Sequence, residues 1–292
     1  MTCNICPRKC NADRSESGNT GGFCRMPLQP VVARAALHMW EEPCISGTNG
    51  SGAIFFSGCS LKCVFCQNYK ISHKSFGKTI TPLRLAEIFS ELEKKGAHNI
   101  NLVNPTHFLF AISEAVKIYR PNIPIVYNSG GYDLGESIEK ASEFVDIFLM
   151  DLKYMSHDRA LKYSGAADYP QVATAAILKC RELRGTAEFY DNGMMKRGLI
   201  IRHLILPHGL CDTRNVINWV ENNAPDAVFS LMSQYTPCGD LEKFPEINRK
   251  LSVTEHRKAL AMLSKSSIRN SYCQQLSSSG GQFIPAFDLQ GV

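Results

Sequence analysis

The chain has 292 residues, of which 44% are apolar and 20% charged, a composition typical of one or two folded domains rather than of a disordered chain. Its 32 basic and 27 acidic residues leave a net charge of +5, which is too small and too evenly spread to indicate a nucleic-acid partner. No apolar run approaches the roughly 20 residues that cross a bilayer, and no apolar signal segment follows Met1. We therefore expect a cytoplasmic protein that neither spans a membrane nor is secreted.

The cysteines are the most informative residues. The chain has 12 of them, and in a reducing compartment clustered thiols more often bind metals or take part in catalysis than form disulfides. Four lie close together at the N-terminus: Cys3, Cys6, Cys10 and Cys24. This segment holds too few apolar side chains to form a core, which predicts that a metal holds it folded. Four thiolates suit structural zinc or a fully ligated iron–sulfur site, and a metal-free group of thiols is the alternative.

Beyond the N-terminal segment, buried strands alternate with helical patterns. Strands are predicted at six places: residues 53–57, 99–103, 125–127, 145–152, 199–206 and 227–232. Strands separated by helices pair in parallel through right-handed crossovers. Because a complete TIM barrel has about eight such units, the sequence predicts an α/β fold with a partial (β/α)6 barrel. We expect three parts, namely a Cys-rich module at 1–45, the barrel at 46–240 and a C-terminal helix and tail at 241–292.

Capping residues predict where several helices begin. Thr81 suits the N-cap of the first long helix. Asp133 is predicted to open a later helix, and Asp212 to cap the helix before the sixth strand. Ser252 and Glu255 have the spacing of a capping box before the last helix.

Three further cysteines form a loop directly after the first predicted barrel strand. Cys59, Cys63 and Cys66 have the spacing Cys-x3-Cys-x2-Cys, and their loop lies at the carboxyl edge of the predicted sheet, where such folds carry their chemistry. Three thiolates can hold three corners of a 4Fe–4S cube and leave the fourth iron open to an outside ligand. A structural zinc site needs a fourth ligand, for which His73 is the nearest candidate.

This loop, with the aromatic Phe65 before its last cysteine, resembles the signature of the radical S-adenosylmethionine (radical SAM) superfamily. Its flanks resemble the activating enzymes of glycyl-radical enzymes, such as the activase of pyruvate formate-lyase. Nearly the whole chain is similar to an uncharacterised branch of that group with a Cys-rich N-terminus. The segments that carry the resemblance are 6–8, 32–38, 40–43, 52–58, 67–68, 233–235 and 283–285.

The resemblance implies a pair of cofactors and a reaction. Cys59, Cys63 and Cys66 would hold a 4Fe–4S cluster whose open iron chelates S-adenosylmethionine. Reductive cleavage would give a 5′-deoxyadenosyl radical, which takes a hydrogen atom from a substrate at the barrel mouth. An activase would form a glycyl radical on a partner enzyme, with electrons from a reductant such as flavodoxin or ferredoxin. The alternatives are a radical SAM enzyme with another small-molecule or peptide substrate and, from a different class, a non-catalytic Cys-rich zinc protein.

The same resemblance implies S-adenosylmethionine contacts at the ends of the predicted strands. Asp151 and Lys153 match an Asp-x-Lys contact of the activases, whereas strand two ends in Asn104 and Thr106 where the activases have a Gly-Gly-Glu segment. The remaining cofactor-binding candidates lie in the cysteine loop, after strand three and in strand five: Phe65, Ser129, Gly130 and Arg202.

Several candidates also have a structural interpretation. Asp151 and Lys153 could form a surface ion pair, and Arg202 could be a buried structural cation. Because neighbouring strand residues face opposite ways, only one of Arg202 and His203 can face the barrel interior. Two thiols after strands five and six are either substrate-facing groups or small buried apolar ones: Cys211 and Cys238.

Overall fold

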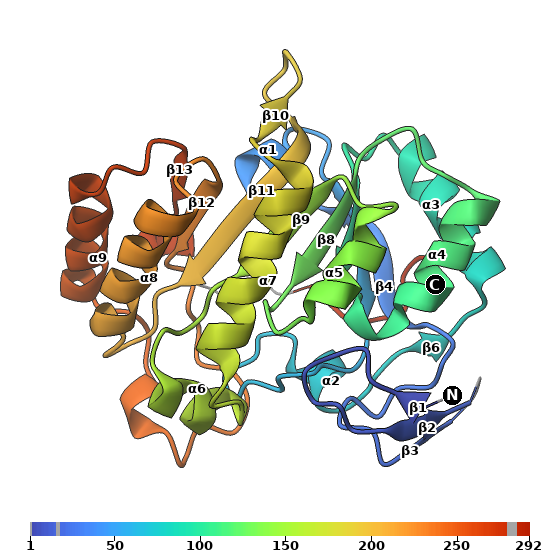
Figure 1. The fold of residues 1–292 in the computed structure, drawn as a ribbon, viewed down its shortest axis with the longest axis horizontal. Helices are drawn as coiled ribbons and strands as arrows, with labels where there is room; N and C mark the ends of the chain where they lie inside the picture. The colour runs from blue at the N-terminus through green and yellow to red at the C-terminus, as the bar shows by residue number, and fades with distance from the viewer. Residues whose placement is uncertain (1, 16–17, 279–284) are drawn as a thin grey trace.

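The computed structural model describes residues 2–15, 18–278 and 285–292, and its largest element is a mostly parallel sheet (Figure 1). Six central strands follow one another across the sheet in chain order: β5 (Ser51–Phe56), β7 (Ile100–Val103), β8 (Ile125–Ser129), β9 (Ile147–Asp151), β11 (Met195–Leu204) and β12 (Val228–Met232). Each pairs in parallel with the next. The prediction of an α/β fold with a partial barrel is confirmed.

The sheet extends beyond the six predicted strands. β4 (Val31–His38) pairs antiparallel with β5 and with β6 (Lys78–Thr79), and β13 (Ser271–Cys273) adds a parallel strand beside β12. β10 (Glu188–Phe189) pairs antiparallel with the start of β11. The sheet therefore crosses both boundaries that the sequence predicted, at residues 45 and 240.

Long helices line one face of this sheet, and two short helices lie near its opposite ends (Figure 1). The long helices are α3 (Pro82–Lys94), α4 (Leu109–Ile118), α5 (Gly135–Ser142), α6 (His157–Ser164), α7 (Tyr169–Arg184), α8 (Leu210–Asn223) and α9 (Val253–Lys265). The short ones are α1 (Pro43–Ser46) and α2 (Tyr69–Ser72), and 3-10 turns lie at Thr106–Phe108, Pro245–Ile247 and Leu276–Ser278. Apolar residues of these helices pack on the outward-facing strand residues to form the main core, as Phe89 and Phe148 illustrate.

Inside the barrel, the side chains change from apolar to polar along the strands. Near the amino ends, apolar residues of four strands pack against Ile45 of α1: Val126, Ile147, Leu149, Ile200 and Val228. Side chains of a strand alternate with a period of two, so the next inward positions are two residues further on. Those positions carry Asn128, Asp151 and Arg202, and β9 and β11 place Asp151 directly opposite Arg202. The carboxyl end of the sheet therefore receives a polar floor.

Two of the four predicted helix caps are confirmed. Thr81 accepts the backbone N–H of the third helical residue of α3, and Ser252 and Glu255 form a complete capping box at α9. The predictions for Asp133 and Asp212 were wrong, because α5 and α8 begin without a side-chain cap. Both carboxylates are buried and accept tertiary hydrogen bonds instead.

The Cys-rich N-terminus forms a small antiparallel sheet of its own, made of β1 (Thr2–Cys3), β2 (Ala12–Arg14) and β3 (Asn19–Thr20). It lies beside α2, at the same end of the molecule as the cysteine loop (Figure 1). Residues 283–284, part of one segment that carries the family resemblance, lie outside the described residues. In the part of the chain that the structure describes, every helix is too short or too polar to cross a bilayer.

Candidate active site

A cavity of about 230 Å³ opens at the carboxyl end of the parallel sheet. The cysteine loop and the ends of the six central strands line it. Ten of the eleven predicted loop and cofactor-binding residues line it, and Thr106 does not: the ten are Cys59, Cys63, Phe65, Cys66, Asn104, Ser129, Gly130, Asp151, Lys153 and Arg202.

The three loop cysteines all reach this cavity, each held by hydrogen bonds to sulfur. The backbone N–H groups of Leu61 and Lys62 donate to Cys59 Sγ over 3.3 and 3.5 Å. Ser164 Oγ lies 3.0 Å from Cys63 Sγ, and Cys66 accepts the N–H of Asn68. Hydrogen bonds of this kind stabilise the thiolate form that binds a metal.

Without bound metal, burial disfavours the ionised form of two of these thiols. Burial raises the pKa of Cys66 to about 12 and also raises the pKa of Cys63, against the opposing effect of the Lys153 ammonium. A metal ligated here would supply the missing positive charge, and its binding would release protons. The donor set therefore fits a group that carries its own charge, such as an iron–sulfur cluster.

Phe65 supports the loop from below as part of an aromatic group. Its ring meets Tyr154, Tyr163 and Tyr235 edge-on, with ring centroids 5.8 to 6.5 Å apart. Tyr235 also donates its hydroxyl to Ile247 O over 2.7 Å, so it serves packing. Edge-on contacts of this kind contribute about 0.5–1.5 kcal/mol each and hold the loop against these rings.

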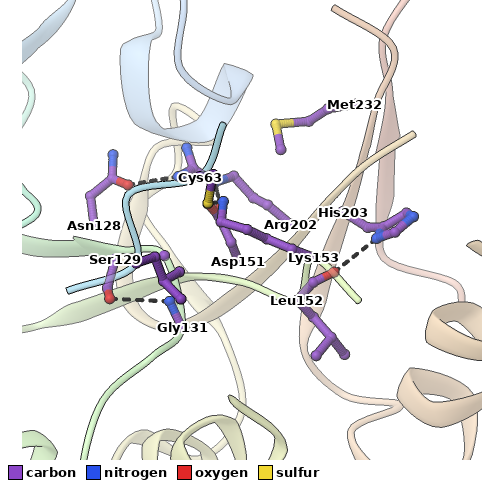
Figure 2. A network of polar contacts seen from close by, with 12 residues as sticks. Cys63, Asn128, Ser129, Gly131, Asp151, Leu152, Lys153, Arg202, His203 and Met232 are labelled. Carbon is purple, nitrogen blue, oxygen red and sulfur yellow. Dashed lines mark hydrogen bonds and ion pairs between the residues drawn. The ribbon is translucent and has the colours of Figure 1, made fainter. Parts of the chain in front are cut away.

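Opposite the loop, Asp151 is paired with two cations. Lys153 Nζ lies 2.5 Å from Asp151 Oδ2, and Arg202 Nε lies 2.8 Å from Oδ1 (Figure 2). Burial alone would raise the pKa of Asp151, but Arg202 and Lys153 outweigh it and lower the pKa below the ordinary value. The pair is therefore not a surface ion pair: it presents a fixed carboxylate and an ammonium group to the cavity.

Arg202 forms its hydrogen bonds with other side chains of the protein. Besides Asp151, it donates to Glu41 Oε2 over 3.0 Å and to Asn128 Oδ1 over 2.6 Å, and Glu42 lies 3.9 Å away. Arg202 lines the cavity, and its hydrogen bonds hold Asp151 in one orientation. Its strand neighbour His203 faces away and bonds Leu152 O and Thr213, so the prediction that only one of them faces inward is confirmed (Figure 2).

The role of Glu41 was missed from the sequence. Its carboxylate accepts hydrogen bonds from Asn101, Asn128 and Arg202, three residues on three different strands. Burial raises the pKa of Glu41, which Arg202 opposes. The segment 40–43 belongs to the family resemblance, but nothing in its spacing indicates that it reaches under the barrel to this network.

Of the two candidates that follow strand β7, one lines the cavity and the other does not. Asn104 lines the cavity, has a left-handed backbone (φ 61°) and donates its amide to Gly58 O, next to the cysteine loop. Thr106 is buried outside the cavity lining and donates its hydroxyl to Asp133 over 2.6 Å.

Asp133 is the second functional position that the sequence did not reveal, because its side chain was expected to cap a helix. It accepts hydrogen bonds from Thr106, Tyr127 and Ser129, and so fixes the turn that carries Gly130. The next residue, Gly131, has a φ of 84°, and a β-carbon there would collide with the Asp151 carbonyl oxygen. Only glycine fits this close approach.

The remaining cysteine candidates lie away from the cavity lining. Cys211 is exposed and Cys238 is half-buried. In residues 2–15, 18–278 and 285–292, no three His, Cys, Asp or Glu side chains converge on one point as the ligands of a single metal ion do. A cubane differs from a single ion because its thiolate ligands bind separate irons.

Comparison with known proteins decides the family. A sequence model of the radical SAM superfamily matches residues 53–204, which run from β5 through the cysteine loop to the end of β11. The chain belongs to the radical SAM superfamily. Membership implies a 4Fe–4S cluster and S-adenosylmethionine, and the three thiols and the Asp151–Lys153 pair on one cavity fit both groups chemically.

This radical SAM protein also resembles specific relatives. It is 30% identical over 273 residues to the uncharacterized protein MJ0674 of Methanocaldococcus jannaschii, across 90% of this chain and 74% of the relative. Streptococcus suis SuiB, in crystal structures bound to S-adenosylmethionine and to the precursor peptide SuiA, matches 74% of this chain. The TM-scores are 0.50 and 0.51 at 11% and 12% identity, a likeness of fold. The chain spans less than half of the SuiB chain, 48% and 46%.

Proposed function

We propose that this protein is a radical SAM enzyme that binds a 4Fe–4S cluster on Cys59, Cys63 and Cys66 and acts on a polypeptide substrate, as an activase does. The observation that supports the cofactor assignment is the shared cavity, which brings the three thiols of one loop opposite the Asp151–Lys153 pair. When bound, the cluster and S-adenosylmethionine together supply one-electron chemistry that generates an organic radical.

The chain's own residues orient the ligand. Asp151 is ionised, and a carboxylate can accept the two hydroxyls of a ribose. Lys153 offers an ammonium group to a ligand carboxylate. Arg202 and Glu41 hold the acidic partner still, because their hydrogen bonds join β9, β11 and the segment before α1. Such fixed charges position a zwitterionic ligand with little reorganisation.

Apolar side chains exclude water from the space between the loop and the strand ends. Phe55, Val103, Leu204 and Met232 line the cavity beside the charged groups. A radical formed there is thus surrounded by side chains rather than solvent, which prevents side reactions.

A polypeptide substrate is supported by the rim of the cavity. Trp40 lines the cavity and is 56% exposed, and large aromatic side chains are the groups that most often anchor protein partners. SuiB, which has the same fold, was solved with a precursor peptide bound, so the fold admits polypeptide substrates. Formation of a glycyl radical on a partner enzyme is the form of this reaction that we propose.

Two measurements test the proposal. Anaerobically reconstituted protein with dithionite and S-adenosylmethionine should form 5′-deoxyadenosine, and a candidate glycyl-radical enzyme should gain a glycyl radical signal in electron paramagnetic resonance (EPR). Cys63→Ala should abolish both, whereas Cys211→Ser, at an exposed thiol outside the cavity, should change neither. Cleavage that small molecules stimulate and protein partners do not would overturn the polypeptide assignment and leave the radical SAM assignment intact.

A further inference from the structure

The four N-terminal cysteines, Cys3, Cys6, Cys10 and Cys24, come together in the small sheet and its turns; we call them the N-terminal thiol group. Each is half-buried. Strand pairing sets Cys3 opposite Ala12, two residues after Cys10, and Arg14, which donates to Met26 O two residues after Cys24, also reaches Cys3 Sγ. The thiols of Cys3 and Cys24 also interact electrostatically with Cys6, which lies beside them. Four thiols from three turns of the chain therefore share one site.

Backbone N–H groups point at three of these sulfurs in a repeated pattern. Cys6, Cys10 and Cys24 each accept a hydrogen bond from the N–H two residues later in the chain: Arg8, Ala12 and Met26. Cys10 accepts a second from Phe23, and Arg14 Nη1 lies 3.7 Å from Cys3 Sγ. Donors aimed at sulfur stabilise a thiolate far more than a thiol.

The cysteine loop of the active site has the same pattern. Cys59 accepts the N–H of Leu61, and Cys66 accepts the N–H of Asn68, again two residues later in the chain. The N-terminal thiol group thus repeats the local geometry of a loop whose family binds iron and sulfide.

Two of the N-terminal turns also have left-handed backbones. Asn11 and Arg25 each follow a cysteine directly and have left-handed backbones, with φ of 51° and 61°. For a residue such as Arg25 this conformation costs roughly 1–2 kcal/mol, whereas asparagine adopts it more readily. The strain turns the next N–H back toward the sulfur, and strain of this kind is retained where a bound ligand repays it.

The N-terminal thiol group touches the active-site loop. A β-carbon at Gly58, the residue before Cys59, would lie 3.0 Å from the carbonyl oxygen of Cys24. Arg8 donates to Ser60 O over 2.7 Å, inside the loop itself. Lys62 Nζ lies 4.9 Å from the ring of Phe23, the neighbour of Cys24. The chain contact Cys24–Gly58–Cys59 leaves no intervening element between the two groups of cysteines.

We infer that Cys3, Cys6, Cys10 and Cys24 hold a second, fully ligated iron–sulfur cluster that relays electrons to the active-site loop. The inference extends the proposed function and names its electron path. An external one-electron protein carrier reduces the N-terminal cluster, which then passes that electron to the loop cluster and returns to its oxidised form. No bond changes partners in this relay. Four ligands leave the N-terminal cluster no open iron, and none of its cysteines lines the active-site cavity.

Metal content of the full-length protein tests the site. After anaerobic reconstitution, we expect about eight irons and eight sulfides per chain, since a cubane ligated by four cysteines holds about four of each. Cys6→Ala/Cys24→Ala should lower both to about half and keep the EPR change that S-adenosylmethionine causes at the loop cluster. Cys59→Ala/Cys63→Ala/Cys66→Ala should also keep about half, with a reduced spectrum that S-adenosylmethionine does not alter.

The variant without the three loop cysteines keeps all four N-terminal cysteines. Its iron content therefore tests the N-terminal site even if Cys6→Ala/Cys24→Ala fails to fold. Zinc in place of the second set of irons, or a loop variant without iron, would overturn the inference while leaving the proposed function untouched. If wild-type protein that holds both clusters forms no 5′-deoxyadenosine, the proposed function is overturned while the second cluster stands.

A ratio of rates tests the relay. S-adenosylmethionine cleavage is measured with dithionite and with reduced flavodoxin, and the ratio of the flavodoxin-driven to the dithionite-driven rate is compared between proteins. For Cys6→Ala/Cys24→Ala we expect this ratio to fall at least about tenfold, because a large carrier loses its nearby entry point while a small ion still reaches the loop. Cys211→Ser should leave the ratio unchanged. An unchanged ratio in the double variant would rule out the relay.

Discussion

The active-site loop and the N-terminal thiol group use the same backbone device and differ in what surrounds it. Both aim N–H groups at sulfur from two residues downstream, and both contain residues with left-handed backbones, Lys62 in the loop and Arg25 in the module. The loop has three thiols, and they line a cavity floored by Asp151 and Lys153. The N-terminal group has four thiols and lines no part of that cavity.

The difference teaches how one ligand chemistry serves two roles. Because the loop has no fourth thiol, a cluster held there would keep one iron open to a ligand, next to the fixed carboxylate and ammonium. A complete set of four leaves room only for electron transfer or structure. If the charges and the thiol count separate the two regions in this way, substitutions in each region should have effects of different size.

The largest effect is expected from removing a loop thiol. Cys63→Ala should lower the rate of S-adenosylmethionine cleavage by about a thousandfold or more, because a cluster held by two thiols does not assemble in the buried site. The rate of 5′-deoxyadenosine formation with dithionite measures it. Cleavage retained at the wild-type rate would place the catalytic cluster elsewhere.

The next effect concerns the charges found only beside the loop. Asp151→Asn should weaken S-adenosylmethionine binding by about 10- to 100-fold, since a charge-assisted hydrogen bond contributes about 1.5–3 kcal/mol. Asp146→Asn makes the same chemical change at the opposite end of β9, where the carboxylate pairs with Arg120, and should leave affinity unchanged. Equilibrium binding of labelled S-adenosylmethionine to the reconstituted proteins measures both. Equal affinities in the two variants would remove Asp151 from the binding site.

A third effect concerns His107, which lies beside Gly58, where the N-terminal thiol group meets the active-site loop. His107 bonds Ser57 O over 2.6 Å beneath Gly58, and burial lowers its pKa to about 3. The folded protein therefore takes up no proton there as the pH falls below the unfolded value of about 6.5, whereas the unfolded chain does. The free energy of unfolding should fall by about 2 kcal/mol between pH 7 and pH 5 from this residue.

Chemical denaturation at several pH values measures that slope. His107→Gln should flatten it, and His157→Gln, at a histidine on the exposed surface of α6, should not. Identical slopes in wild type and His107→Gln would contradict the prediction.

The smallest effect concerns the strained turn of the N-terminal module. Arg25→Gly removes the cost of a left-handed side chain and should stabilise the protein by about 0.5 kcal/mol after the entropy of glycine is counted. Asn4→Gly, at an exposed position of the same module outside the left-handed region, should destabilise slightly. Thermal unfolding of the holoprotein compares the two. A destabilised Arg25→Gly would mean that contacts of the arginine outweigh the strain.

The sequence predicted the parallel core of the fold because each central strand is a short apolar run flanked by turn residues. It missed β4, whose alanines have weak strand propensity, and β13, which has only three residues. Local patterns also placed Asp133 and Asp212 at helix caps, where the same side chain can accept a cap bond or a tertiary one. Burial decides between these uses, and it depends on the whole fold.

The candidate site was likewise predicted from the sequence only in part. Cys59, Cys63 and Cys66 are close in the chain, so their spacing alone predicted a shared loop, and the Asp-x-Lys pair stands on one strand end. Glu41 lies 161 residues from Arg202, and no periodicity connects them. Their contact exists because α1 closes the amino end of the barrel and brings the acidic segment beneath the strands.

The most direct test of the central claim is the EPR spectrum of the dithionite-reduced Cys6→Ala/Cys24→Ala protein, which carries the loop cluster alone, with and without S-adenosylmethionine labelled with nitrogen-15 at its amino group. We expect a 4Fe–4S signal that shifts when the ligand is added and acquires hyperfine coupling to the labelled nitrogen. A signal that S-adenosylmethionine leaves unchanged would contradict an open iron facing Asp151 and Lys153.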